Sequence, residues 1–179
     1  MVVHPTSPVA WQAFRATFDQ KLSESLSKHI ASIPLAEDAF LHTLFGHITP
    51  LSEQGKRIRP FVASLAFEAA GGNTENQPWD AWIGIELIHL SAMVHNDLID
   101  HGRQRHAVET MQTFVARHLQ EQDRHGDYTH IAESEALLVG NMLHALAFTQ
   151  LTQAIHSLPH ATEAYEILFR LIQEIIVGQ

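Results

Sequence analysis

Two short stretches of the sequence gather polar residues at spacings that suit ligand binding. The first, Gly55–Pro60, carries three cations within four residues: Lys56, Arg57 and Arg59. Pro60 suits the first turn of a helix, and lysine and arginine side chains beside a helix N-terminus form an anion site. A solvated basic turn is the plainer interpretation of such a cluster on its own. The second stretch favours the anion site.

The second stretch combines carboxylates with arginines at the end of a long apolar segment. In chain order its polar residues are Glu86, His89, Asn96, Asp97, Asp100, Arg103, Arg105, His106 and Thr110. Positions 96, 97 and 100 share one face of a helix, and two carboxylates at the negative end of the helix dipole are unfavourable unless a cation binds. Carboxylates followed by arginines within about two turns are typical of adjacent Mg²⁺ and diphosphate sites. The spacing alone also fits a surface helix end with ordinary salt bridges.

The elements that must position these residues are helices. Helical periodicity runs through nearly every segment and no segment alternates as a strand does, so we expect one all-α domain over residues 1–179. The expected helices are Pro8–Ser32, Glu37–Ile48, Arg59–Ala70, Pro78–His101, Val108–Gln122, Ala132–His156 and Ala161–Val177. The fourth is apolar around most of its circumference, which predicts a central helix. We expect Gly71-Gly72 and Gly102 to end the third and fourth helices, and Gln120–His130 to form a loop.

Composition and charge exclude several classes of function. A net charge of −9 argues against general nucleic-acid binding and against attraction to anionic lipid surfaces. The absence of cysteine excludes disulfides, thiolate nucleophiles and cysteine-ligated metals. The first residues lack the pattern of a secretory signal, and the apolar segments are shorter than the ~20 residues that a spanning helix needs. We therefore expect a cytoplasmic protein without stable membrane insertion.

Together the two stretches resemble the trans-type polyprenyl synthetase family. In that family a G-K-x-x-R-P turn is followed by E-L-x-H, an aspartate-rich D-D-x-x-D, an R-R pair and a G-D-x-L-L-x-x-A-F segment. The matching segments here, in the same order, are Gly55–Pro60, Glu86–His89, Asn96–Asp100, Arg105-His106 and Gly140–Phe148. The resemblance covers roughly residues 10–179. It implies an isoprenoid synthase-type helical bundle, of which this chain would be about the first half.

The resemblance also implies an activity and assigns residues to it. The implied enzyme is a Mg²⁺-dependent prenyltransferase that condenses an allylic diphosphate with isopentenyl diphosphate into a longer trans-polyprenyl diphosphate. The residues that would bind isopentenyl diphosphate are Lys56, Arg59, His89 and His106. Arg105 would bind the allylic diphosphate, and Mg²⁺ would meet Asn96, Asp97 and Asp100, the two aspartates being catalytic. A homodimer, or a heteromer with another synthase, would be the assembly.

Product length in this family is set by side-chain bulk just before the aspartate-rich motif. The residues at that level are Ser91 and Ala92, both small. The resemblance therefore implies no aromatic floor there. It permits a product longer than fifteen carbons, with a floor that could lie deeper.

Four departures from the family pattern affect this assignment. Asn96 replaces the first aspartate of the motif, which should weaken Mg²⁺ binding, and His106 replaces an arginine with a shorter, titratable group. Asn141 replaces the aspartate of the G-D segment, a change that we interpret as structural. Family members are about twice as long and carry a second aspartate-rich motif, so we expect a C-terminally truncated chain that is inactive alone. Gly178-Gln179 resembles the start of the family's G-Q-x-x-D motif.

Other functions fit the residues less well. Glu86 and His89 form a Glu-x-x-His pair, but a di-iron bundle needs a second pair and two further glutamates, which the sequence lacks. The fourteen histidines are scattered, which argues against metal storage. A terpene cyclase would not need the set Lys56, Arg59 and His89 for a second diphosphate. The alternative that sequence leaves open is a non-catalytic, degenerate synthase-like partner that modulates an active synthase.

Overall fold

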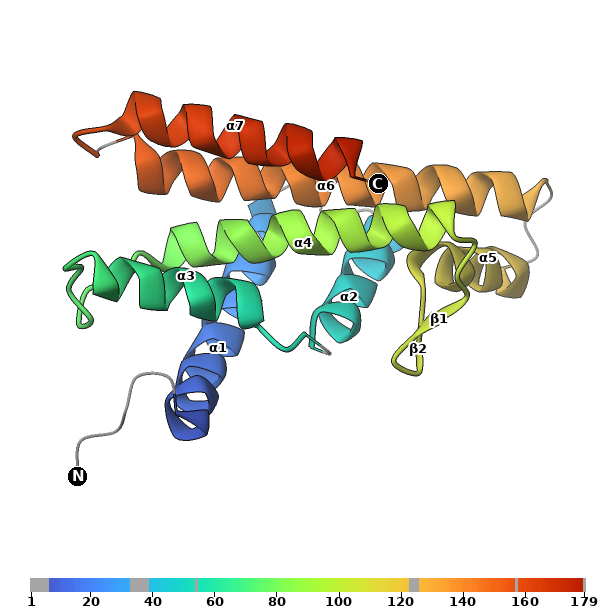
Figure 1. The fold of residues 1–179 in the computed structure, drawn as a ribbon. Coiled ribbons are helices and arrows are strands. Elements are labelled where there is room, and N and C mark those ends of the chain that lie inside the picture. The colour runs from blue at the N-terminus through green and yellow to red at the C-terminus, as the bar shows by residue number, and fades with distance from the viewer. Residues whose placement is uncertain (1–6, 33–38, 54, 123–125, 157, 179) are drawn as a thin grey trace.

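The fold is a bundle of helices with one short hairpin at its edge (Figure 1). The computed structural model describes residues 7–32, 39–53, 55–122, 126–156 and 158–178. Within these ranges the elements are α1 Pro8–Ser32, α2 Ala39–Glu53, α3 Ile58–Ala69, α4 Trp79–Ile99, β1 Gln104–Arg105, β2 Val108–Glu109, α5 Met111–Glu121, α6 Tyr128–Ile155 and α7 Ala161–Val177. The all-α prediction is confirmed, and the bounds predicted for the first and last helices agree with the structure.

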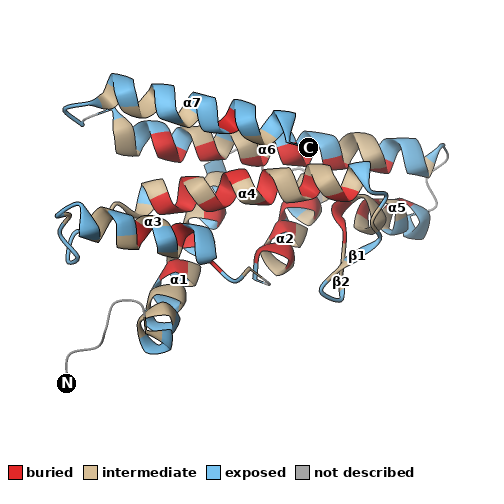
Figure 2. Ribbon diagram, viewed as in Figure 1, coloured by how far each residue is buried: buried red, intermediate tan, exposed pale blue. Residues whose placement is uncertain are grey.

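Helix α4 lies at the centre of the bundle, as its apolar circumference predicts. Buried residues run along most of its length and along the facing side of α6 (Figure 2). The two helices run antiparallel and approach closely because small residues lie between them. A Cβ atom at Gly84 would collide with Leu151 of α6, and the Ser91 hydroxyl donates to the Gly140 carbonyl at 2.8 Å. These contacts fix the register of α4 against α6.

Aromatic side chains join α1 to α3 and α4 on the other side of the bundle. Phe14 stacks on Phe18 and Trp79 and packs against Phe61, with ring centroids 5.3–5.7 Å apart. Such contacts bury large apolar areas and favour offset or tilted rings. No helix of the described residues is long and apolar enough to cross a membrane.

The two predicted glycine stops differ in outcome. Helix α3 ends as expected, with Gly71 at φ 90° and the Gly72 amide donating to the Phe67 carbonyl, which is the Schellman pattern. At the end of α4, His101 takes the left-handed conformation at φ 50°, and the Gly102 amide donates to the Asp97 carbonyl at 2.9 Å. Gly102 therefore closes the end of α4 through its amide, as predicted, while the left-handed conformation falls on the preceding His101.

The expectation of a strand-free chain is also wrong, because a hairpin follows α4. β1 and β2 pair antiparallel, with Arg105 opposite Val108. His106 and Ala107 form the two-residue turn, both at positive φ, which is the geometry that suits a tight hairpin. The helix predicted from Val108 therefore begins only at Met111. Strands of two residues are too short to show alternation in a sequence.

Other boundaries shift by a few residues. Helix α2 continues through Pro50 to Glu53, although proline inside a helix removes one hydrogen bond. The extra turn buries Leu51 and Ser52, which favours its continuation. Helix α6 begins at Tyr128 because the Asp127 carboxylate caps it, accepting from the amides of Thr129 and His130. Residues 123–125 of the predicted loop lie outside the described residues.

We predict that acid destabilises the fold partly through His47. Its ring stacks on Phe114 at 3.9 Å and lies within 2.8 Å of the Glu109 carbonyl, and burial lowers its pKa below 6.5. A histidine with a lowered folded-state pKa stabilises the fold above the unfolded pKa, and this stabilisation is lost as the pH falls. Urea unfolding from about pH 7.5 to about pH 5.5 should show a steeper loss of stability in the native chain than in His47→Gln. Equal slopes would contradict this role.

Candidate functional site

The basic turn before α3 presents two of its three cations to solvent. Lys56 and Arg59 are exposed, and the Lys56 carbonyl accepts a hydrogen bond from the Trp11 indole at 3.1 Å. Arg59 lies in the first turn of α3, where backbone amides without helical partners favour anions. Both side chains are accessible to an anion, and their binding of a diphosphate stays a prediction.

The third cation, Arg57, points into the protein. It is 2% exposed and adopts the left-handed conformation at φ 55°. Its guanidinium donates to Glu86 of α4 and to Asp19 of α1, both at 2.7 Å. Gly55 is required beside it, because a Cβ at that position would collide with the guanidinium. Arg57 therefore holds the turn in place. The sequence does not indicate this role, because Arg57 lies in a run with two other basic residues.

We predict that Arg57→Ala lowers the free energy of unfolding by about 3–5 kcal/mol, because it leaves the Glu86 carboxylate buried without its partner. Arg117→Ala is the matched control, since Arg117 also pairs with two carboxylates but its side chain is 45% exposed. Exposed pairs contribute at most about 1 kcal/mol. Urea unfolding measures both variants, and equal losses would show that Arg57 is not a structural anchor.

His89 connects the basic turn to the rest of the site. It lies on α4 one turn after Glu86 and is half-buried. Burial lowers its pKa, and the nearby positive charges of Arg59, Arg105 and Arg57 lower it further against the opposing effect of Glu86. Arg59 of α3 and Arg105 of the hairpin are therefore both close enough to His89 to affect its charge. The neutral form of the His89 imidazole is therefore favoured near pH 7.

The carboxylates at the end of α4 occupy different environments. Asp97 is buried and accepts from Nε and Nη2 of Arg105, the shortest distance being 2.6 Å. This hydrogen bonding raises the pKa of Arg105. Asn96 is half-buried and Asp100 is exposed at the helix end. The sequence did not predict the Asp97–Arg105 pair, which links the aspartate-rich helix end to the hairpin.

Gln112 and Thr110 fasten the same junction, and sequence reasoning gave neither a positioning role. The Gln112 amide donates to the carbonyls of Asp97 and Gly102, both at 2.7 Å. The Thr110 hydroxyl is fully buried and donates to the Gly102 carbonyl at 2.7 Å. Carbonyls at a helix end lack helical partners, so these two side chains stabilise the turn between the aspartates and Arg105.

His106 is separated from the other residues expected at this site. It lies at the exposed tip of the hairpin with φ 50°. Within the described ranges, no hydrogen bond or ion pair joins its ring to Lys56, Arg59 or His89. Its expected contact with isopentenyl diphosphate stays a prediction.

The donors present suit a hard cation that is shared with a ligand. Among the residues described, no cluster of three histidine, aspartate or glutamate side chains is positioned to hold a metal. Asp97 is engaged by Arg105, which leaves the Asn96 amide oxygen and the Asp100 carboxylate on one face of α4. Mg²⁺ commonly binds through one or two carboxylates together with water and substrate phosphates. The oxygen donors therefore fit Mg²⁺ held jointly with a diphosphate.

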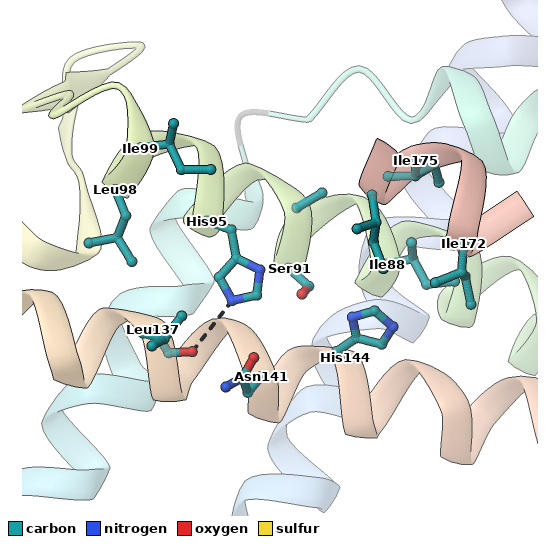
Figure 3. Close-up of a pocket in the computed structure, with 12 residues that line it drawn as sticks. Ile88, Ser91, His95, Leu98, Ile99, Leu137, Asn141, His144, Ile172 and Ile175 are labelled. Carbon is teal, nitrogen blue, oxygen red and sulfur yellow. Dashed lines mark hydrogen bonds between the residues drawn. The ribbon is translucent and has the colours of Figure 1, made fainter. Parts of the chain in front are cut away.

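An apolar pocket of about 450 Å³ runs along α4 beside this site. Figure 3 shows its walls converging from three helices. Its lining residues are Ile88, Ser91, Ala92, His95, Leu98 and Ile99 of α4, Leu137, Asn141 and His144 of α6, and Ile172, Ile175 and Ile176 of α7. Leu98 and Ile99 place one end of the pocket next to Asp100. Ser91 and Ala92, which the sequence assigns to product length, both line it.

Comparison with known proteins agrees with this architecture. A crystal structure of geranylgeranyl pyrophosphate synthase from Corynebacterium glutamicum, complexed with isoprenyl diphosphate and magnesium, superposes with a TM-score of 0.71 and 26% identity, over 79% of this chain and 41% of that one. The all-α isoprenoid synthase fold is thereby established. Residues 40–179 match the polyprenyl synthetase family. The chain therefore belongs to the polyprenyl synthetase family.

Individual relatives are similar over part of their length. A geranylgeranyl diphosphate synthase from Sulfolobus acidocaldarius is 32% identical over 127 residues, which are 70% of this chain and 33% of that protein. A short chain isoprenyl diphosphate synthase from Methanocaldococcus jannaschii is 26% identical over 160 residues, 89% of this chain and 41% of that protein. The chain thus matches between a third and two fifths of these relatives.

Proposed function

We propose that this chain forms the diphosphate-binding part of a Mg²⁺-dependent prenyltransferase that extends an allylic diphosphate with isopentenyl diphosphate. One observation carries the proposal: α4 contributes to both a polar and an apolar part of the site. It bears the aspartates and His89, which lies near three arginines, and it forms a wall of the apolar pocket, which Leu98 and Ile99 line next to Asp100 in the chain. A ligand with an anionic head and a hydrocarbon tail matches both features. Membership of the polyprenyl synthetase family supports the same reaction.

In the proposed reaction the residues divide between the two diphosphates. Lys56, Arg59 and His89 hold isopentenyl diphosphate, with His106 as a further contact. Arg105 grips the allylic diphosphate, because its Nη1 group takes no part in the hydrogen bonds to Asp97 and remains able to donate. Asn96 and Asp100 form the metal-facing side; Asp97, which the family resemblance also assigns to the metal, is held by Arg105 in the free protein. Mg²⁺, when bound, supplies positive charge that stabilises the leaving diphosphate.

The proposed chemistry balances as a substitution followed by loss of a proton. The allylic carbon–oxygen bond breaks, and the electron pair leaves with inorganic diphosphate. The alkene of isopentenyl diphosphate then forms the new carbon–carbon bond, and a proton is lost to give the longer chain. Arg105 stabilises the departing charge, while the apolar walls at Ser91 and Ala92 exclude water from the cation.

The first test is binding of isopentenyl diphosphate to the chain, measured by titration calorimetry. We predict that Lys56→Ala or Arg59→Ala weakens this binding by about tenfold or more, since each removes a charge-assisted contact. Lys28→Ala is a matched control, because Lys28 is an exposed lysine on α1. Unchanged binding in Lys56→Ala and Arg59→Ala would contradict the assigned site.

Turnover is tested separately on the longest form of the protein that the gene encodes, since the 179-residue chain alone is expected to be inactive. The substrates are labelled isopentenyl diphosphate and a series of allylic diphosphates. Mg²⁺-dependent incorporation by the protein would support the prenyltransferase. Binding without turnover, combined with stimulation of a second synthase, would instead favour the non-catalytic partner. The expected homodimer or heteromer and the cytoplasmic location stay predictions, and a sedimentation measurement tests the first.

We further predict that Asn96→Asp tightens the Mg²⁺ dependence of diphosphate binding several-fold, because a carboxylate replaces a neutral amide oxygen at the metal-facing side. The measurement is a Mg²⁺ titration of allylic diphosphate affinity in the native chain and in the variant. Asn76→Asp is the control, since Asn76 is an exposed asparagine in the turn between α3 and α4. An unchanged Mg²⁺ titration for Asn96→Asp would show that position 96 does not meet the metal.

A further inference from the structure

The peptide group between Lys56 and Arg57 is held by contacts to both of its residues. The Trp11 indole of α1 donates to the Lys56 carbonyl at 3.1 Å. The Arg57 guanidinium donates to Asp19 of the same helix and to Glu86 of α4. Because a peptide group is planar, these contacts fix the rotation of one rigid unit of the backbone. That rotation decides how the Lys56 side chain is placed relative to the residues that follow the turn.

The backbone of Arg57 favours a change in this rotation. Arg57 is left-handed, with φ 55° and ψ 29°, which is unfavourable for a residue with a Cβ atom. Rotation of the preceding peptide by half a turn would bring φ of Arg57 back to a negative value. Strained conformations persist only where their surroundings fix them. The Trp11 hydrogen bond is one such restraint, because a rotated peptide would carry the Lys56 oxygen away from the indole.

Trp11 belongs to a row of side chains along α1. Trp11, Arg15 and Asp19 are spaced four residues apart and therefore share one face of the helix. Arg15 lies over the Trp11 ring, 6.0 Å from its centroid, and pairs with Asp19 at 3.5 Å. Asp19 in turn pairs with Arg57 at 2.7 Å. This face of α1 thus binds both the carbonyl that precedes Arg57 and the Arg57 side chain.

We propose that Trp11 is a positioning residue for the diphosphate site, acting through its hydrogen bond to the Lys56 carbonyl; this inference rests on the proposed function. With the bond in place, Lys56 and Arg59 keep one fixed arrangement before the ligand arrives. Groups that are ordered in advance bind more tightly than groups that must be ordered on binding. Without the bond the strained peptide relaxes, and the two cations no longer act together on one ligand.

The first measurement is the affinity of the chain for isopentenyl diphosphate and for inorganic diphosphate, by titration calorimetry. Trp11→Phe keeps an aromatic ring and removes the N–H donor, so both affinities should fall by about threefold to tenfold. Trp11→His should restore them, because the histidine Nε2 takes the same place in its five-membered ring as the indole Nε1. Trp79→Phe is the matched control, the same change at a tryptophan that stacks on Phe14 of α1, and it should bind both anions as the native chain does.

The second measurement needs no ligand. Trypsin cleaves after lysine and arginine, so the peptide bond between Lys56 and Arg57 is itself a cleavage site, and mass spectrometry measures the cut there. Cleavage of a folded chain requires local opening. The rate should rise several-fold in Trp11→Phe and stay at the native value in Trp11→His and Trp79→Phe. Cleavage after Lys28, which is exposed on α1, is the internal reference, because a general loosening of α1 would speed both cuts.

The inference fails if Trp11→Phe binds both anions as tightly as the native chain does, or if Trp11→His binds them as weakly as Trp11→Phe. Unchanged cleavage after Lys56 in Trp11→Phe would also overturn it. The proposed function fails separately, when the native chain does not bind isopentenyl diphosphate. Binding of inorganic diphosphate that depends on Trp11 would support the positioning role even then, whereas binding of neither anion by the native chain would overturn both.

Discussion

The buried guanidinium of Arg57 is the constraint on which the geometry of the basic turn depends. Its two ion pairs at 2.7 Å join the turn to Asp19 of α1 and to Glu86 of α4. A buried charge is tolerated only when it is paired and hydrogen-bonded, so this side chain cannot leave without a large cost to the fold. Because the backbone at Arg57 is left-handed, the chain turns sharply there. The inward Arg57 and the exposed Lys56 and Arg59 are therefore two consequences of one local conformation.

Helix α4 connects this anchored turn to the aspartates and to the apolar pocket. Its polar face ends in the aspartates, and its apolar face lines the pocket, so one rigid element would position both the head and the tail of the proposed ligand. The close approach of α6 fixes the second wall, and Gly140 allows it because a Cβ there would collide with the His95 ring. Rigid helices place side chains more reproducibly than loops do. The hairpin is less regular, and it is fastened by Arg105, Thr110 and Gln112 instead.

Most of the helical framework could be predicted from sequence, because apolar periodicity reports burial directly. The central position of α4 and the glycine stop at Gly71 follow from the same signals. The hairpin could not be predicted, since Gln104–Glu109 is too short for alternation and its turn residues, His106 and Ala107, are not the usual formers of such turns. The inward direction of Arg57 was hidden for a different reason. From a run of basic residues alone, one cannot tell which side chain will pair with carboxylates inside the protein.

The distribution of charge gives a physical reason for a cation in the proposed diphosphate binding. The chain carries a net charge of −9, and two of the arginines nearest the site already neutralise carboxylates: Arg57 pairs with Glu86 and Asp19, and Arg105 pairs with Asp97. Of the cations assigned to the ligands in the described chain, only Lys56 and Arg59 lack such a carboxylate partner. Burial lowers the pKa of His89, and the same arginines that would attract an anion lower it further. In the proposed function a diphosphate would bring several negative charges next to Asp100, whose carboxylate has no such arginine partner among the described residues, so the two would repel each other unless a divalent ion lay between them. The carboxylate that would oppose binding in the free protein would then help to hold the ion.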